Sequence, residues 1–141
     1  MKAGVVQFIK GKWKTGEQVF CQNHPDVEYF SIGEGFTWDT QDKTGDMERT
    51  AKCWEKAKEM IANPEIDFVL IDELNVVTSF NYLQIQEVLS TLDEKPLNTH
   101  VVITGRGASP ELIAIADTVS EINSPKHAFD NGIRAQKGIE F

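Results

Sequence analysis

The chain has 141 residues, of which 40% are hydrophobic and 26% are charged, a balance typical of a folded globular protein and not of a disordered one. This length fits one domain, residues 1–141, with a single core. The formal net charge of -8 disfavours nonspecific binding to nucleic acid or to an anionic membrane. We therefore expect a small ligand or a protein partner.

The cysteines and histidines exclude two further classes of protein. Cys21 and Cys53 form no CxxC pair, and the three histidines are scattered, so we expect reduced thiols and no zinc site. No secretory signal opens the chain, and no apolar run is long enough to span a bilayer. These features together favour a cytoplasmic protein.

Five short segments rich in β-branched and aromatic residues are expected to be strands. They are Ala3–Ile9, Val27–Ile32, Asp67–Ile71, His100–Thr104 and Thr118–Ile122. The third and fourth are continuously apolar, which is typical of strands buried on both faces of a parallel sheet. The segment "GKWKTG" after the first strand is interpreted as a surface loop.

Three segments between these strands are expected to be helices. Apolar residues recur at three- and four-residue steps in Asp46–Ala62, a helix that Thr44 or Asp42 could cap, and again in Tyr82–Leu92. The third helix begins after Ser109, because a cap residue, a first-turn proline and an acid follow one another in "SPE". Strands that alternate with helices through short links predict an α/β fold with a parallel sheet and right-handed crossovers.

The segment "DFVLIDELN" places Asp72 and Glu73 at the end of an apolar strand. This is the form of a Walker B element, in which carboxylates hold Mg²⁺ directly or through water. The alternative is that the two acids only cap the following helix. The residues alone leave both interpretations open.

Two other segments have candidate ligand contacts. In "VVITGRGAS", Gly105 and Gly107 flank Arg106 directly after a strand, which suits either a phosphate chain or a tight turn with a solvated arginine; the turn is favoured on these residues alone. In "GEGFTWDTQD", Phe36 and Trp38 point the same way on an extended segment and could line an apolar ligand surface or join the core. The polar flanks of that segment favour the ligand.

The cations Arg134 and Lys137 lie among small residues in "NGIRAQKGIEF" at the end of the chain. They could bind an anion or be ordinary surface charges. The residue types favour surface charges.

Taken in order, "GVVQFIKGKWKTGE", "GEGFTWDTQD", "DFVLIDELN", "HVVITGRGASPELIAIADTVSEI" and "KHAFDNGIRAQKGIEF" resemble the ATP:corrinoid adenosyltransferase family from the first residues to the last. The resemblance implies a P-loop NTPase (RecA-like) fold. It also implies transfer of the 5′-deoxyadenosyl group of ATP to the cobalt of cob(I)yrinic acid a,c-diamide or cob(I)alamin, with release of triphosphate, in cobalamin biosynthesis or salvage.

The resemblance further implies roles for individual residues. Phe36 and Trp38, with Thr37 between them, would press on one corrin face and strip the lower axial ligand, which makes cob(II) easier to reduce. Asp72 and Glu73 would organise Mg²⁺ on the triphosphate. Asn75 and Arg106 would lie near the nucleotide and assist its binding. A homodimer and a flavodoxin-type electron donor are also implied.

The sequence departs from the family at the phosphate-binding loop. The motif GxxxxGK[ST] occurs nowhere in the chain, and "GKWKTG" cannot form the nest of backbone N–H groups that a phosphate needs. We therefore expect a sheet that lacks the first strand–P-loop–helix unit, and weak binding of MgATP. The missing strand would leave a gap beside the strand before Asp72: either the chain is a fragment of a longer gene product, or its neighbours close up, or a second chain fills the space. The first and the last are favoured, because proteins avoid open strand edges.

The alternative function is that of a protein that binds a corrinoid but does not catalyse transfer. The absent phosphate-binding loop and the "GFTW" segment both argue against a third function, that of a generic P-loop NTPase.

Overall fold

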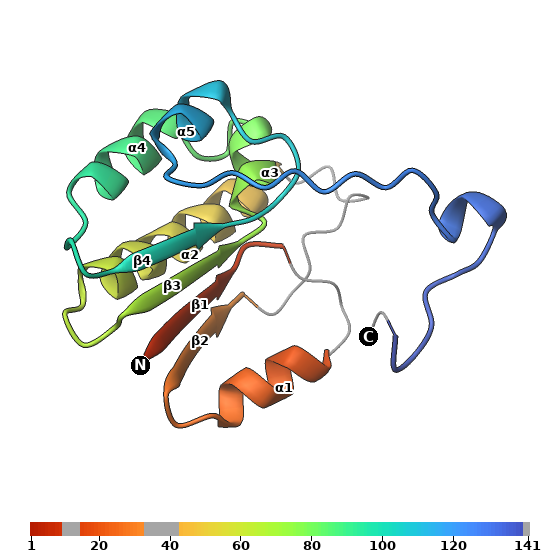
Figure 1. Ribbon diagram of the computed structural model, residues 1–141, viewed down its shortest axis with the longest axis horizontal. Coiled ribbons are helices and arrows are strands. Elements are labelled where there is room, and N and C mark those ends of the chain that lie inside the picture. Colours follow the sequence, from red (N-terminus) through yellow and green to blue (C-terminus); the bar gives the residue numbers. More distant parts are fainter. Residues whose placement is uncertain (10–14, 33–42, 140–141) are drawn as a thin grey trace.

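The computed structural model describes residues 1–9, 15–32 and 43–139, which form a mixed α/β structure (Figure 1). Its sheet has four strands in the order β2-β1-β3-β4, and every neighbouring pair is parallel. The strands are β1 (Ala3–Gln7), β2 (Val27–Ser31), β3 (Phe68–Asp72) and β4 (His100–Ile103). The predicted parallel α/β class and four of the five predicted strands are confirmed.

The fifth predicted strand is wrong. Residues 118–122 form no strand, and the whole stretch from 116 to 139 is exposed. A β-branched segment becomes a strand only where another strand pairs with it, and none of the described strands does so here. Figure 1 shows this C-terminal part running out beyond the body of the protein.

The gap expected beside the strand before Asp72 is also absent. β3 pairs with β1 on one side, where Gln7 aligns with Asp72, and with β4 on the other, where Ile71 aligns with Ile103. Within the described part of the chain, the unpaired edges of the sheet are β2 and β4. The carboxyl end of β3 therefore lies between two neighbours and is not at an edge.

Five α-helices and one 3-10 turn complete the described structure: α1 (Gly16–Asn23), α2 (Lys43–Ala62), α3 (Leu74–Ser79), α4 (Ile85–Asp93), α5 (Pro110–Ile115) and η1 (Phe129–Asn131). The three predicted helices correspond to α2, α4 and α5. Helices α1 and α3 were not predicted, because both are short and the first exposes most of its side chains. None of the described helices combines the length and apolar character needed to cross a bilayer.

The helix starts test the predicted caps. Ser109 is confirmed as the cap of α5, since its Oγ accepts a hydrogen bond of 3.2 Å from the backbone N–H of Leu112. α2 begins at Lys43, so Thr44 lies inside the helix and does not cap it. The other predicted cap, Asp42, lies outside the described residues.

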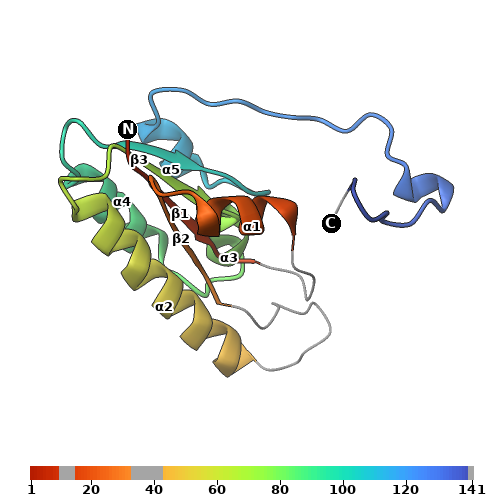
Figure 2. The same cartoon turned by 90° about the horizontal axis from the view of Figure 1, so that it is seen from below.

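The core lies between the sheet and α2, which covers one face of the strands (Figure 2). Alternate strand residues, including Val6 and Val69, are fully buried beneath this helix together with Trp54. Gly4 permits the close approach, because a Cβ at that position would lie 2.8 Å from Met60 Sδ. Because Gly4 has no side chain, α2 can pack closely against β1.

The opposite face of the sheet is only partly covered. Val5 and Leu70 are half-buried and Val102 is 42% exposed, so the prediction that β3 and β4 are buried on both faces is wrong for the described structure. The total accessible surface is 9815 Å², whereas a compact monomer of this mass exposes about 7,300 Å². Large apolar side chains, among them Val119 and Ile122, contribute to this excess.

Candidate functional site

Asp72 lies at the centre of a hydrogen-bonded network that crosses the whole sheet. Its Oδ2 accepts from Gln7 Nε2 at 3.1 Å, and its Oδ1 accepts from Thr104 Oγ1 at 2.7 Å. Tyr29 on β2 donates its hydroxyl hydrogen to Gln7 Oε1. Side chains from β2, β1 and the end of β4 therefore hold one carboxylate at the end of β3.

Glu73 follows directly and has an unusual backbone conformation. Its φ of 62° lies in the left-handed region, which favours glycine, and this conformation costs a non-glycine residue about 1 kcal/mol or more. Its N–H donates to Thr104 Oγ1 at 3.1 Å, so the same hydroxyl contacts both acids. Burial raises the pKa of Glu73, and the neighbouring Asp72 charge raises it further, while the Arg106 charge lowers it.

The loop after β4 packs tightly against the start of α3. Asn75 Nδ2 donates to the carbonyl of Gly105 at 3.1 Å, and Asn75 N–H donates to the carbonyl of Thr104 at 3.3 Å. Gly105 has a φ of 120°, and a Cβ there would lie 3.2 Å from both Asn75 Cβ and Glu73 Cα. Only glycine fits at this position without displacing the helix start.

Asn75 carries an unsatisfied acceptor at this site. The residue is 5% exposed, and its Oδ1 has no hydrogen-bond partner among the described residues. A buried acceptor without a donor costs about 1–3 kcal/mol. The site therefore gains stability if a ligand or a further part of the chain supplies a donor to Asn75.

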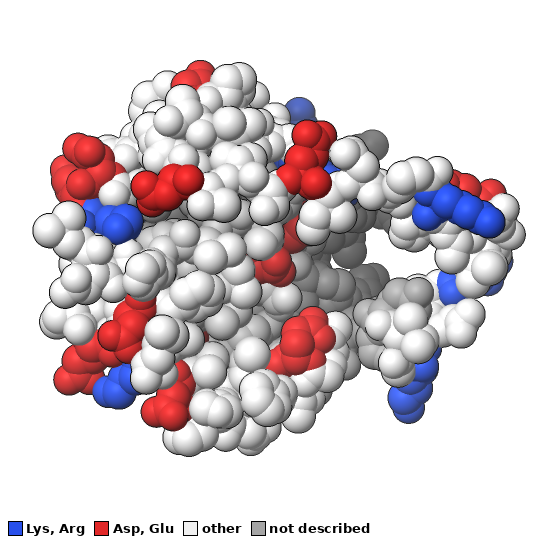
Figure 3. Space-filling view, in the orientation of Figure 1, with Lys and Arg blue, Asp and Glu red and all other residues white. Residues whose placement is uncertain are grey.

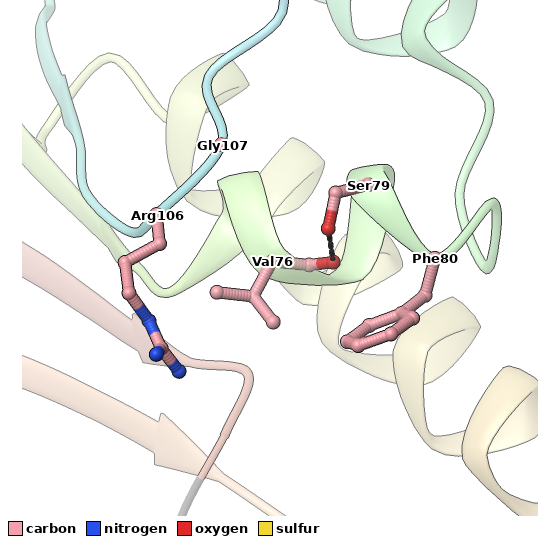
Figure 4. A pocket seen from close by; sticks show the side chains of 5 residues that line it. All are labelled: Val76, Ser79, Phe80, Arg106 and Gly107. Carbon is pink, nitrogen blue, oxygen red and sulfur yellow. Dashed lines mark hydrogen bonds between the residues drawn. The ribbon is translucent and has the colours of Figure 1, made fainter.

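A recess of about 300 Å³ lies between α3 and the loop after β4. Its lining residues are Val76, Ser79, Phe80, Arg106 and Gly107. In Figure 4, Val76 lies between Arg106 on one side and the Phe80 ring on the other. The recess thus has an apolar floor, with a cation at one end and an aromatic ring at the other.

The structure brings four of the predicted site residues together. Asp72, Glu73, Asn75 and Arg106 come from β3, the start of α3 and the loop after β4, and all lie at the carboxyl edge of the sheet. The other three, Phe36, Thr37 and Trp38, lie outside the described residues.

The C-terminal cations lie apart from this group. Arg134 and Lys137 are exposed on the projecting C-terminal segment, as expected of surface charges, and Figure 3 shows the basic side chains of that segment. Acidic side chains are scattered over the body of the same face.

Sequence reasoning missed several residues of this site, namely Gln7, Tyr29, Thr104, Val76, Ser79 and Phe80. One signal was present, because Gln7 is a polar residue in the otherwise apolar run "AGVVQFI". Phe80 carries no such signal, since an isolated aromatic residue usually belongs to the core.

The oxygen donors of Asp72 and Glu73 match the ligands that Mg²⁺ takes in proteins. Mg²⁺ takes oxygen ligands and usually keeps several waters, with one or two carboxylates and substrate phosphates completing its shell. The described residues contain no group of three or more His, Cys, Asp or Glu side chains placed to hold a metal ion. Asp72 and Glu73 therefore fit an ion held mainly by water and phosphate, and they do not form an all-protein cage.

The whole chain is similar to one family of known proteins. The protein family described as ATP:corrinoid adenosyltransferase BtuR/CobO/CobP matches residues 1–141. A corrinoid adenosyltransferase of Pseudomonas aeruginosa is 48% identical over 142 residues, which cover 100% of this chain and 70% of that protein. The corrinoid adenosyltransferase of Escherichia coli K12 is 45% identical, with 99% of this chain and 71% of that protein covered. The Salmonella typhimurium protein named corrinoid adenosyltransferase CobA is 44% identical, with 98% of this chain and 70% of that protein covered.

Proposed function

The chain belongs to the ATP:corrinoid adenosyltransferase family, and on this premise we propose that it transfers the 5′-deoxyadenosyl group of ATP to the cobalt of a reduced corrinoid. The cobalt attacks C5′ of the nucleotide, a cobalt–carbon bond forms, and the C5′–oxygen bond breaks with release of triphosphate. The corrinoid is cob(I)yrinic acid a,c-diamide or cob(I)alamin, in cobalamin biosynthesis or salvage in the cytoplasm. The observation that carries the proposal is the match over residues 1–141, together with the four polar residues gathered at one sheet edge.

The position of these residues supports a nucleotide site. Open parallel sheets bind ligands beyond the carboxyl ends of their strands, and Asp72, Glu73, Asn75 and Arg106 lie at this edge. Arg106 would bind phosphate oxygens, while Asn75 Oδ1 would accept a hydrogen bond from the nucleotide or its water. Bound Mg²⁺, held by Asp72 and Glu73, would neutralise charge on the departing triphosphate.

The fold supports this assignment as far as the described residues reach. A parallel sheet with acids at the end of a central strand is the arrangement expected of the P-loop NTPase (RecA-like) class. We assign the chain to that class as one domain.

The corrinoid side of the site is assigned to Phe36, Thr37 and Trp38. β2 ends at Ser31 and is parallel to β3, so its carboxyl end lies at the sheet edge that carries Asp72, five residues before Phe36 in the sequence. The rings of Phe36 and Trp38 would form an apolar surface against the corrin, exclude water from the lower face of the cobalt, and leave it four-coordinate.

Two partners complete the proposal. A second copy of the chain would cover some of the exposed apolar side chains, since the total accessible surface of 9815 Å² exceeds that of a compact monomer and β4 is an unpaired edge of the described sheet. A flavodoxin-type protein would supply the electron that converts cob(II) to cob(I). This second partner follows from the family alone.

A direct assay tests the proposed reaction. The chain is mixed with millimolar MgATP and chemically reduced cob(I)alamin, and adenosylcobalamin is followed by its absorbance. Product that depends on both the chain and ATP supports the proposal. The Asp72→Asn variant is expected to form product at least about tenfold more slowly, since one charge on the proposed metal is lost.

The second candidate is a corrinoid-binding protein that does not catalyse transfer. It is favoured by one observation, that GxxxxGK[ST] does not occur in residues 1–141. Electron paramagnetic resonance with cob(II)alamin distinguishes the two: a four-coordinate signal without adenosylcobalamin in the parallel assay supports this second candidate. Trp38→Ala is expected to abolish that signal, and an unchanged signal in the variant contradicts the assigned role of Trp38.

A further inference from the structure

Four polar side chains form a row across the sheet, which we call the polar row. It consists of Tyr29 on β2, Gln7 on β1, Asp72 on β3 and Thr104 after β4, strands that lie side by side in Figure 1. Gln7 aligns with Asp72, and Tyr29 lies two residues before the partner of Gln7 on β2. These three belong to the alternate strand residues that point away from α2. The polar row therefore lies on the partly covered face of the sheet.

The hydrogen bonds between Tyr29 and Asp72 run in one direction. The Tyr29 hydroxyl donates to Gln7 Oε1, and Gln7 Nε2 donates to Asp72 Oδ2 at 3.1 Å. Burial raises the pKa of Tyr29, with a smaller opposite effect from its hydrogen bond with Ser31, so the phenol keeps its hydrogen at neutral pH. An ionised carboxylate only accepts, so a single orientation of the Gln7 amide satisfies both neighbours. Tyr29 thus selects the atom that Gln7 presents to Asp72.

The backbone of Gln7 is also held in place. Its carbonyl accepts from the Sγ of the buried Cys53 on α2 at 3.8 Å. On the other side, the N–H of Phe8 donates to the backbone carbonyl of Asp72 at 3.1 Å. The carboxyl end of β1 is therefore tied to a helix and to the neighbouring strand, which gives the Gln7 side chain a fixed base.

We propose that Gln7 and Tyr29 are positioning residues that set the affinity of Asp72 for its metal ion. The inference deepens the proposed function and rests on it for the role of Asp72. Each oxygen of Asp72 accepts one hydrogen bond, from Gln7 or from Thr104, so rotation of the carboxylate would break both. Each oxygen still has lone-pair capacity for an ion or its water. Groups that orient a metal ligand in this way commonly determine much of the metal affinity.

A purely structural role of the polar row predicts a different outcome. If Tyr29 and Gln7 only join the strands, their loss lowers the free energy of unfolding but leaves metal binding by the folded chain unchanged. If they position Asp72, their loss weakens metal binding, and it does so only while the Asp72 carboxylate is present. Metal affinity in single and double variants therefore separates the two roles.

Mn²⁺ is a suitable probe, because it takes octahedral oxygen ligands as Mg²⁺ does. Its binding to the whole chain is followed by the electron paramagnetic resonance signal of the free ion. Binding that remains in Asp72→Asn belongs to other carboxylates, so the difference from wild type defines the Asp72 site. Gln7→Leu is expected to weaken this site about tenfold. Tyr29→Phe, which keeps the ring, should weaken it about threefold, since it removes one hydrogen bond.

Two controls test whether these effects act through Asp72. In the Asp72→Asn background, neither Gln7→Leu nor Tyr29→Phe should change the remaining Mn²⁺ binding. Gln86→Leu, at an exposed glutamine on α4, is the matched control and should bind Mn²⁺ as wild type does. Circular dichroism checks that each variant is folded, and Tyr29→Phe carries the test if Gln7→Leu is not.

The Mg²⁺ dependence of adenosylcobalamin formation provides a second readout. Tyr29→Phe should raise the Mg²⁺ concentration for half-maximal rate about threefold and leave the rate at saturating Mg²⁺ nearly unchanged. A lower saturating rate with an unchanged Mg²⁺ requirement contradicts a role in metal positioning.

Several results of the Mn²⁺ titrations would overturn the inference. They are an unchanged affinity in both variants, an equal loss in the Asp72→Asn background, the same loss in Gln86→Leu, or no Asp72-dependent site in wild type. Product formation with unchanged Mn²⁺ affinity in Gln7→Leu and Tyr29→Phe removes only the positioning roles. An Asp72 site that weakens in both variants, without any product, removes only the transferase assignment.

Discussion

The side-chain amide of Gln7 donates a hydrogen bond of 3.1 Å to Asp72 Oδ2, and the two residues align directly across β1 and β3. The bond joins the carboxyl ends of two neighbouring parallel strands. Asp72 is therefore oriented by the sheet itself, with Thr104 holding its second oxygen. An acid held in this way keeps its position when a charged ligand arrives, because its hydrogen-bond donors belong to rigid elements.

Thr104 is expected to stabilise the site through its hydroxyl. Thr104→Val keeps the shape of the side chain but removes the donor to Asp72 and the acceptor for the Glu73 N–H. Two partly buried groups lose a partner, so the free energy of unfolding should fall by about 1–3 kcal/mol. Urea unfolding measures this change. Thr104→Ser is the control that keeps the hydroxyl, and a valine variant as stable as the serine variant contradicts the network.

Gly105 is expected to tolerate no side chain. Gly105→Ala places a Cβ at a φ of 120° and 3.2 Å from Glu73 Cα, so it combines backbone strain with a close contact. Gly132 is a matched control, since its φ is 76° but a Cβ there meets nothing within 4 Å. Thermal unfolding should show a loss of about 1–3 kcal/mol more for Gly105→Ala than for Gly132→Ala. Equal losses would show that the contact with the start of α3 is unimportant.

The pH dependence of stability should change in a defined direction when Glu73 is neutralised. The pKa of Glu73 is raised in the folded state, mainly by burial, so its ionisation destabilises the fold. The stability of Glu73→Gln relative to wild type should therefore rise as the pH increases from 4.5 through the raised pKa, and stay higher at neutral pH. Below pH 4.5 the carboxyl group of Glu73 is protonated in both the folded and the unfolded chain, so its charge should no longer contribute to the difference in stability between the two proteins.

Glu65→Gln provides a control of opposite sign. A hydrogen bond from Lys2 lowers the pKa of Glu65, so this acid stabilises the fold above pH 4.5 and loses that contribution as the pH falls through its lowered pKa. Its glutamine variant should thus lose stability, relative to wild type, where the Glu73 variant gains it. Chemical denaturation at a series of pH values checks both. The same sign for the two variants contradicts the assignment for Glu73.

The exposed apolar residues of the C-terminal segment should contribute to association of two chains. Ile122 is 95% exposed and Val119 also faces solvent, so lysine at both positions should leave the stability of the single chain unchanged. The proposed dimer should dissociate about tenfold more readily, because an apolar contact is replaced by charge. Light scattering over a range of concentrations measures this. Leu97→Lys, at another exposed apolar residue, is the control, and equal effects would place the contact elsewhere.

The sequence predicted those helices and caps that depend on residues only a few positions apart. The periodicity of residues 46–62 and the cap at Ser109 depend on residues a few positions apart, and both were found at or near the expected place. The failed strand at 118–122 depends on a pairing partner, which no local pattern supplies. The contact of Gln7 with Asp72 spans 65 residues and depends on the strand register, so the sequence alone did not predict it.

The candidate site was predicted in part for the same reason. Asp72 and Arg106 each follow an apolar strand, and parallel strands bring such positions to one edge. The recess at Phe80 depends on how α3 turns after Glu73, where a left-handed φ at a glutamate gives no sequence signal. This recess therefore became visible only in three dimensions.

The phosphorus products of the reaction test the central claim most directly. Phosphorus NMR is recorded on the chain after incubation with MgATP and cob(I)alamin, alongside the absorbance of adenosylcobalamin. The account predicts inorganic triphosphate in an amount equal to the adenosylated corrinoid, because only cleavage at C5′ releases all three phosphates together. ADP and orthophosphate in place of triphosphate, or unchanged ATP beside unreacted corrinoid, would contradict it.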